Sequence, residues 1–261
     1  MTLLSIDIDK ETVTKVTQIV RFRKFEWLHL PLIRARNMKA FLKARLSIRQ
    51  YELARSLNYE FKRWKCRIGA PKQFETDLTK FHLGCGDRHL KGWLNVDLFE
   101  SDVNLDIARG SLPFADDQFE VIVSQHVIEH LTIEDELIPL LKECHRCLSM
   151  GGEIWLSTPD MEKVARSYVE QGNDDMVADR KKRLPHWGLK GLPNQHFMND
   201  MFHQELEHRN LFDQGLLEWT LTQAGFNRFE RVDEGKLLER YPAFPPRNDD
   251  YQSIYMKATK T

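Results

Sequence analysis

The residues best suited to chemistry gather in one short glycine turn. A run of apolar residues from Phe81 to Leu83 enters a turn that contains Gly84 and Gly86. Glycine lets the backbone fold sharply and approach a ligand closely, where a side chain would block contact. The turn alone is not specific, because a dinucleotide fingerprint has a third glycine where this chain has His89. The residues that follow must decide between a nucleotide site and an ordinary strand end.

Acidic side chains close the next two predicted strands. Asp97 ends one apolar run and Asp106 ends the next. A carboxylate at the carboxyl end of a strand can accept hydrogen bonds from both hydroxyls of a ribose. Because the carboxyl ends of parallel strands meet at one edge of a sheet, we expect Gly84, Asp97 and Asp106 to lie close together. They indicate a nucleoside pocket.

Short apolar runs separated by helical patterns must position these groups. This texture begins near residue 80 and is typical of a mostly parallel sheet covered by helices. The last run alternates apolar residues at Ile254, Met256 and Ala258, as a half-buried strand does. The runs predict strands at 80–83, 93–97, 103–106, 119–124, 153–158, 229–232 and 253–258.

Taken together, these motifs resemble the class I S-adenosylmethionine-dependent methyltransferases, in particular the methyltransferase type 11-like branch. The resemblance covers about residues 81–160, with a looser match from His208 to Phe226. One departure is that Asp97 follows Gly84 by 13 residues rather than by about 20, so the first crossover helix is expected to be short. The matching motifs are Leu-Gly-Cys-Gly at 83–86, Gly-Trp-Leu-Asn-Val-Asp at 92–97, Leu-Pro-Phe at 112–114, Val-Ile-Glu-His-Leu at 127–131 and Gly-Gly-Glu-Ile at 151–154.

The resemblance implies an α/β, Rossmann-like fold, with a seven-stranded, mostly parallel sheet, an antiparallel last strand, helices on both faces and an N-terminal helical extension. It implies an enzyme that transfers a methyl group from the cofactor S-adenosyl-L-methionine. Gly84 and Gly86 would pack against the methionine part of the cofactor, and Asp97 would hold the ribose. Asp106 and Ile107 would border the adenine. The full set of implied cofactor contacts is Leu83, Gly84, Cys85, Gly86, Asp97, Leu98, Asp106, Ile107, Gln125 and His126.

The acceptor is not written in these motifs. The branch resembled often accompanies polysaccharide biosynthesis, so the resemblance points to a hydroxyl of a sugar, glycan or glycolipid. Alignment and water exclusion supply most of such catalysis, but a hydroxyl acceptor benefits from a base. His126, just past a strand end, is the first candidate base, followed by His203 and His208. Three roles remain possible for His196, His203 and His208: ligands of a metal cluster, a base, or part of a solvated lid. The irregular segment 184–203 is expected to face the substrate.

Several residues also fit other sites. His126, Glu129 and His130 form the His-x-x-Glu-His pattern of an inverted zinc protease, which would make the chain a zinc hydrolase. No further acidic ligand has a compelling place beside them, so we expect no metal site. Cys144 and Cys147 form a Cys-x-x-Cys pair, but they share a helical face with leucines and are expected in the core. Another alternative is a protein that binds S-adenosylmethionine without transferring its methyl group.

Charge divides the chain into two parts. Residues 1–75 hold 17 basic and 7 acidic residues, a net charge of +10, whereas residues 76–261 hold 21 and 32, a net charge of −11. Residues 32–64 contain no glycine or proline and carry apolar residues three or four apart, which predicts a long basic amphipathic helix that Gly69 ends. We therefore expect a basic helical extension at 1–75 and the methyltransferase domain at 76–261.

The basic extension offers a surface for a partner. Three interpretations stay open: packing on the acidic domain or in a homodimer, contact of residues 10–67 with an anionic membrane face, and binding of RNA or another polyanion. No run approaches the roughly 18 apolar residues of a membrane span, and the first residues lack a secretion signal. We expect a cytoplasmic protein, either free or at the membrane surface. An apolar content of 41% excludes wholesale disorder, and four cysteines do not make a disulfide framework.

Overall fold

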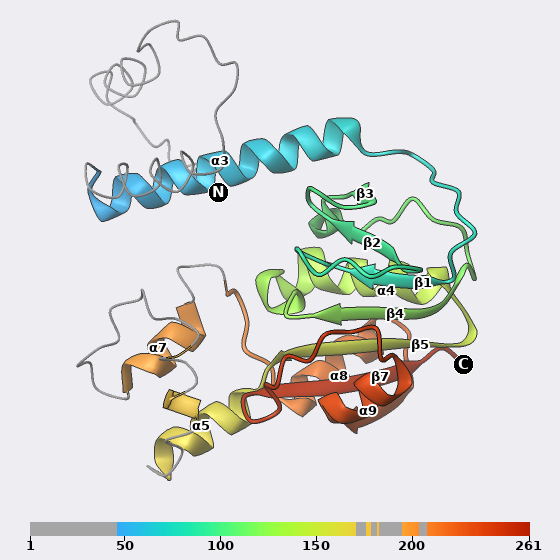
Figure 1. Cartoon of the computed structure of the whole chain (residues 1–261). Helices are drawn as coiled ribbons and strands as arrows, with labels where there is room; N and C mark the ends of the chain where they lie inside the picture. The colour runs from blue at the N-terminus through green and yellow to red at the C-terminus, as the bar shows by residue number, and fades with distance from the viewer. Residues whose placement is uncertain (1–45, 171–175, 179–181, 183–194, 204–207) are drawn as a thin grey trace, which may run out of the picture. The chain divides into compact units, whose positions relative to one another are not determined.

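The computed structural model describes residues 46–170, 176–178, 182, 195–203 and 208–261. The chain divides into two compact units, residues 1–58 and 59–261. Most of the first unit, including much of the helix expected at 32–64, lies outside the described residues, as does most of the segment 184–203. The sheet and the site both belong to the second unit (Figure 1).

Seven strands form the central sheet: β1 Lys80–Leu83, β2 Leu94–Asp97, β3 Val103–Asn104, β4 Phe119–Gln125, β5 Leu148–Pro159, β6 Arg228–Val232 and β7 Ser253–Thr259. Their order is β3-β2-β1-β4-β5-β7-β6 (Figure 1). Neighbours run parallel except β7, which is antiparallel to β5 and β6. This confirms the expected sheet. Because the order reverses between β1 and β4, a ligand is expected outside the carboxyl ends of these two strands.

Every predicted strand is present, although some ends are shifted. β3 stops at Asn104, because the chain soon enters a 3₁₀ turn, Ile107–Arg109, which ends at the left-handed Gly110. β5 begins at Leu148, five residues early, because Leu148 pairs with Phe119 before an irregularity in the β4–β5 register. These shifts leave the carboxyl ends of β1, β2 and β4 where the sequence placed them or one residue beyond.

The helices begin and end at recognisable signals. The side chains of Asp160, Asp213 and Asp233 accept backbone N–H groups in the first turns of three helices, which satisfies donors that a helix start leaves unpaired. The long basic helix ends at Gly69, as predicted. No helix in the described ranges combines the length and the apolar character needed to cross a bilayer. The described helices are α3 Ile48–Gly69, α4 Ile138–Cys147, α5 Met161–Val169, α7 Gln195–His203, α8 Gln214–Gln223 and α9 Glu234–Arg240.

The central strands separate two apolar cores. Ile122 of β4 and Ile154 of β5 lie in one core together with residues of α4 and α8. Their neighbours Val123 and Trp155 lie in a second core together with Leu237 of α9. Successive strand residues point to opposite faces, so this alternation places helices on both sides of the sheet, as expected (Figure 1).

The connection from β1 to β2 contains turns and no helix, where the spacing predicted a short one. The side chain of Asn95 instead holds this connection in place through hydrogen bonds. Its Oδ1 accepts the backbone N–H of Leu90 at 2.8 Å, and its Nδ2 donates to the Leu90 carbonyl at 3.1 Å. Ten residues are enough for this clamp, which explains why Asp97 follows the glycine turn so closely.

The four cysteines are all buried side chains. All four are free and buried, and Cys144 and Cys147 are completely inaccessible within the apolar core. Burial raises the pKa of the Cys147 thiol to about 12, so this thiol stays protonated near neutral pH. The interpretation of the Cys-x-x-Cys pair as core is confirmed.

Candidate active site

The glycine turn packs directly against the segment that follows β4. Gly84 has φ +70°, and a Cβ at this position would lie 2.3 Å from Cγ2 of Val127. The backbone N–H groups of Gly84 and Cys85 both donate to the carbonyl of Val96, at 2.8 and 3.1 Å. Cys85, within the turn, is only 2% exposed. Only glycine fits at position 84, because both the backbone angle and the space exclude a side chain.

Asp97 faces this turn from the end of β2. Its Oδ2 accepts the N–H of Gly86 at 2.8 Å, and its Oδ1 accepts the N–H of Leu98 at 2.6 Å. No atom lies within 4 Å of the Cβ position of Gly86, so the backbone there is open to a ligand. A carboxylate has about four lone-pair sites, which leaves acceptors for two ribose hydroxyls. The structure thus brings together the two groups that the resemblance assigns to the cofactor.

Asp106 is occupied by the end of helix α3. Its carboxylate, 6% exposed as a residue, accepts Nε of Arg63 at 3.1 Å and Nε of Arg67 at 2.5 Å. Burial alone would lower the pKa of Arg63, but the hydrogen bond and charge of Asp106 raise it, so the guanidinium stays charged. The sequence analysis missed both arginines. Their signal is a spacing of four, which places both on one face of a helix.

His126 sits at the end of β4 in a strained backbone conformation, with φ +57°. Its Nε2 lies 2.9 Å from Oδ2 of Asp249 and 3.1 Å from Oγ of Ser253, and its Nδ1 lies 3.3 Å from Oε1 of Glu129. Burial lowers the pKa of His126, but the two carboxylates outweigh burial and raise it. The two carboxylates therefore favour the imidazolium form of this ring, and that form has no lone pair to accept a proton.

Asp249 is the carboxylate that contributes most to raising the pKa of His126. It is 0% exposed, and besides His126 it binds the Tyr255 hydroxyl at 2.6 Å and Nε of Arg247 at 3.0 Å. Burial would raise the pKa of this carboxyl, but its bonds to His126, Tyr255 and Arg247 hold it well below the ordinary value. Sequence reasoning missed Asp249, which lies 123 positions from His126 in no recognisable motif.

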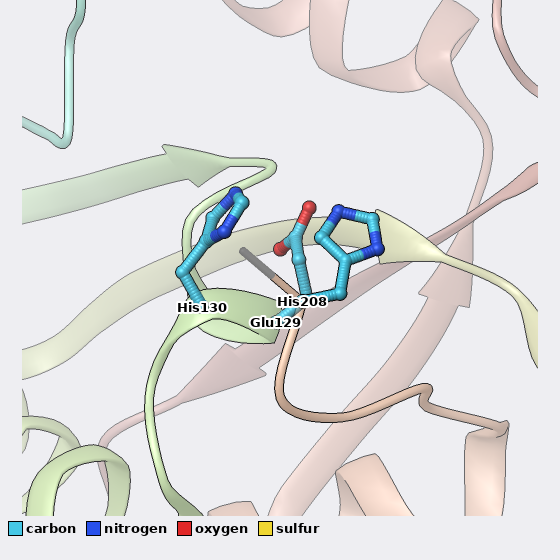
Figure 2. A group of neighbouring side chains, drawn as sticks. All are labelled: Glu129, His130 and His208. Carbon is cyan, nitrogen blue, oxygen red and sulfur yellow. The ribbon is translucent and has the colours of Figure 1, made fainter. Parts of the chain in front are cut away.

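A second group of polar side chains involves the 3₁₀ turn that follows His126 in the chain. Figure 2 shows the carboxylate of Glu129 between the rings of His130 and His208. One ligand atom from each of the three lies within 4.8 Å of the other two. The ring centroids of His130 and His208 are 5.0 Å apart. Burial lowers the pKa of both histidines, so both rings are neutral near pH 7.

The His-x-x-Glu-His pattern is therefore divided between two groups. Glu129 and His130 join His208 from a distant segment, whereas His126 turns to Asp249. His203 is exposed at the end of α7 and is not part of the cluster. Gln125 is 6% exposed at the end of β4, and its Nε2 has no hydrogen-bond partner among the described residues. The roles of Leu83, Leu98, Ile107 and Gln125 at the cofactor stay predictions.

One family model and several solved structures are similar to this chain. Residues 82–156 match the family model described as a methyltransferase domain. No curated protein matches the chain. Similar solved structures include an S-adenosylmethionine-dependent methyltransferase from Mesorhizobium loti, with 17% identity, a TM-score of 0.38, and coverage of 76% of this chain and 97% of that one.

Two further similar structures are of proteins longer than this chain. One is a Nostoc punctiforme protein named as an O-methyltransferase, with 11% identity, a TM-score of 0.32, and coverage of 56% of this chain and 32% of that one. The other is Haemonchus contortus phosphoethanolamine N-methyltransferase 2 in complex with S-adenosyl-L-methionine, with 14% identity, a TM-score of 0.39, and coverage of 78% and 52%. The chain thus spans about a third and about half of these two proteins. All three TM-scores are below 0.5, so these structures support no conclusion about the function of this chain.

Proposed function

We propose that the chain is a class I S-adenosylmethionine-dependent methyltransferase, on the strength of the methyltransferase-domain match at residues 82–156, and that it methylates a hydroxyl oxygen in an acceptor of the sugar, glycan or glycolipid class. The observation that carries this proposal is the group of Glu129, His130 and His208 beside the carboxyl end of β4. Val127, which packs on the glycine turn, lies two residues before Glu129. The group therefore stands next to the part of the pocket assigned to the methionine end of the cofactor.

The chain's own residues fit the cofactor. The space at Gly86 and the close packing at Gly84 leave bare backbone facing the pocket, and Asp97 offers acceptors to a ribose. When bound, S-adenosylmethionine supplies an electrophilic methyl group on a sulfonium. Transfer neutralises that positive charge, so alignment and exclusion of water can provide most of the rate.

A hydroxyl acceptor explains the two neutral imidazoles. A hydroxyl must lose its proton as it attacks, and the two carboxylates beside His126 favour its charged form, which cannot accept one. His208 donates through Nδ1 to the carbonyl of Met201 at 2.7 Å, which leaves the lone pair on Nε2. In this proposal His208 replaces His126, the first candidate from the sequence, as the residue that assists deprotonation.

A polar acceptor such as a sugar suits the surroundings of this group. Gln125 is buried at the end of β4, and its Nε2 has no hydrogen-bond partner among the described residues. An apolar acceptor would leave this donor desolvated without a partner, at a cost of about 1–3 kcal/mol. A molecule with several hydroxyls can supply that partner.

The experiment is a product assay with the full chain, S-adenosylmethionine and a panel of acceptors. The panel contains methyl glycosides, nucleotide sugars, a catechol and a primary amine, and mass spectrometry detects the methylated product. We expect methylation of a sugar hydroxyl. His208→Gln should lower kcat by about 100-fold or more, whereas His145→Gln, a histidine of α4 that packs on Phe226, should not.

Two outcomes would contradict the proposal. Methylation of the amine alone, or of the catechol alone, would reject the acceptor class. Tight binding of S-adenosylhomocysteine without turnover of any acceptor would favour the protein that binds the cofactor without transferring its methyl group.

A further inference from the structure

We propose that Glu129, His130 and His208 form a binding site for a divalent transition-metal ion. The three side chains come from a turn that follows β4, the 3₁₀ turn Ile128–His130, and from a residue that lies 78 positions later. Figure 2 shows their polar ends converging on one point. This departs from the expectation of no metal and from the pattern that suggested a zinc hydrolase, because His208 takes the place of His126.

The distances between the three side chains are close to those of a metal site. One ligand atom from each residue lies within 4.8 Å of the other two. Ligands about 2.0–2.1 Å from a tetrahedral ion are about 3.4 Å apart. Small rotations of the side chains are enough to bridge the difference.

Glu129 has an oxygen that lacks a hydrogen bond. The residue is 0% exposed, and Oε2 accepts the Thr158 hydroxyl at 3.2 Å. Oε1 has no hydrogen-bond partner among the described residues, although Nδ1 of His126 lies 3.3 Å away. A buried carboxylate oxygen without a hydrogen bond is costly. His126 offers this oxygen an ion-pair contact but no hydrogen bond, and a metal ion at the cluster would give it a direct bond.

The tautomer of His208 is the one that a metal requires. Its Nδ1 lies 2.7 Å from the Met201 carbonyl, which can only accept, so Nδ1 carries the hydrogen. Nε2 then carries the lone pair that a metal ion needs. A backbone carbonyl bound to the remote nitrogen is the usual support for a metal-binding histidine.

Backbone hydrogen bonds hold the two distant segments together. The carbonyl of Glu129 accepts the N–H groups of Arg209 and Asn210 at 2.8 and 3.2 Å. Nδ2 of Asn210 donates to the carbonyl of Leu131 at 2.5 Å. The residue after His208 is thus tied to the main chain of Glu129 itself. This makes the approach of the three side chains a property of the fold rather than of flexible surface chains.

The donor set indicates the kind of ion. Two imidazoles and one carboxylate suit Zn²⁺, Mn²⁺ or Fe²⁺, whereas Mg²⁺ and Ca²⁺ prefer oxygen ligands throughout. Three protein ligands leave at least one position open, as in catalytic rather than structural sites.

The role of the ion rests on the proposed function, because the open position would take the acceptor hydroxyl. With the ion bound, Nε2 of His208 is a ligand, so His208 would assist deprotonation through the ion and not by taking the proton itself. Coordination lowers the pKa of the hydroxyl, and its proton passes to water. The oxygen then bonds to the methyl carbon as the carbon–sulfur bond breaks, and the electron pair of that bond stays on sulfur. The products are a methyl ether, S-adenosylhomocysteine and a proton.

The test is metal binding by the full chain without cofactor or acceptor. The protein is stripped with a chelator and titrated calorimetrically with Zn²⁺, Mn²⁺ and, as a control, Mg²⁺. We expect one Zn²⁺ or Mn²⁺ per chain and much weaker binding of Mg²⁺. His208→Gln and Glu129→Gln should each weaken binding at least about 10-fold, and His145→Gln should leave it unchanged.

Thermal unfolding guards against variants that do not fold. The metal should raise the Tm of the wild type and of His145→Gln but not that of the folded His208→Gln variant. Absence of saturable Zn²⁺ and Mn²⁺ binding, or equal binding by wild type and His208→Gln, would overturn the site. Because this readout needs no turnover, the metal site can fail while hydroxyl methylation stands. Metal binding with methylation of an amine would instead reject the proposed function alone.

Discussion

Replacing Gly84 with alanine tests how the glycine turn packs against Val127. Gly84 has φ +70°, and an added Cβ would lie 2.3 Å from Cγ2 and 3.0 Å from Cγ1 of Val127. The left-handed backbone costs an alanine about 1–2 kcal/mol, and overpacking adds about 1–3 kcal/mol. We therefore expect Gly84→Ala to lower the free energy of unfolding by about 2–5 kcal/mol.

Gly92→Ala is the matched control. Gly92 has φ +80°, but no atom lies within 4 Å of its Cβ position, so only the backbone cost of about 1–2 kcal/mol applies. Val127→Ala removes both methyl groups, and the double variant with Gly84→Ala should recover most of the steric cost. Urea unfolding of the variants without cofactor measures the coupling as a double-mutant cycle.

Two results would refute this reasoning. Equal losses for Gly84→Ala and Gly92→Ala would show that no side chain crowds position 84. A coupling with Val127 below about 0.5 kcal/mol would mean that the two substitutions act independently. In either case the segment after β4 would not lie against the turn, and Glu129 and His130 would lose the contact that places them near the cofactor.

Three further predictions concern polar groups of the pocket and of the core. Asp97→Ala should weaken binding of S-adenosylhomocysteine by several-fold or more, measured by calorimetry, and unchanged affinity would mean that the ribose contact is misplaced. Burial lowers the pKa of His82 to about 4; the unfolded chain therefore takes up a proton first, and stability should fall between about pH 6.5 and 4, by up to about 3 kcal/mol. Urea unfolding of His82→Gln should show a weaker dependence over that range, and an identical dependence would assign the effect to other groups. Arg63→Met removes one of the two cations on Asp106 and should cost about 1–3 kcal/mol of unfolding free energy; no loss in thermal or urea unfolding would show that Arg67 alone satisfies the carboxylate.

The parts of the fold that depend on neighbouring residues could be predicted from the sequence. β1 ends where its apolar run meets Gly84, and β2 ends at Asp97, because strand periodicity and turn chemistry are local. The same holds for Cys144 and Cys147, whose helical spacing put them in the core. These features needed no knowledge of what packs against them.

The polar partners of the site could not be predicted, because they come from distant parts of the chain. Asp249 reaches His126 across 123 positions, and no spacing rule connects the two. That contact raises the pKa of His126 and so favours its charged form, which cannot act as a base. His208 was already a candidate, but its meeting with Glu129 depends on a main-chain contact that leaves no sequence pattern.

The resemblance implies that Asp106 borders the adenine, and on that expectation the arginine pair on Asp106 would link cofactor binding to the hold on α3. An adenine amino group seated beside this carboxylate would compete with Arg63 and Arg67 for the same oxygens. By thermodynamic linkage, the factor by which the cofactor loosens α3 is also the factor by which a firmly held α3 weakens cofactor affinity. Amide hydrogens in the last turns of α3 should then exchange faster in the loaded enzyme than in the free one, which would make this helix an internal reporter of occupancy.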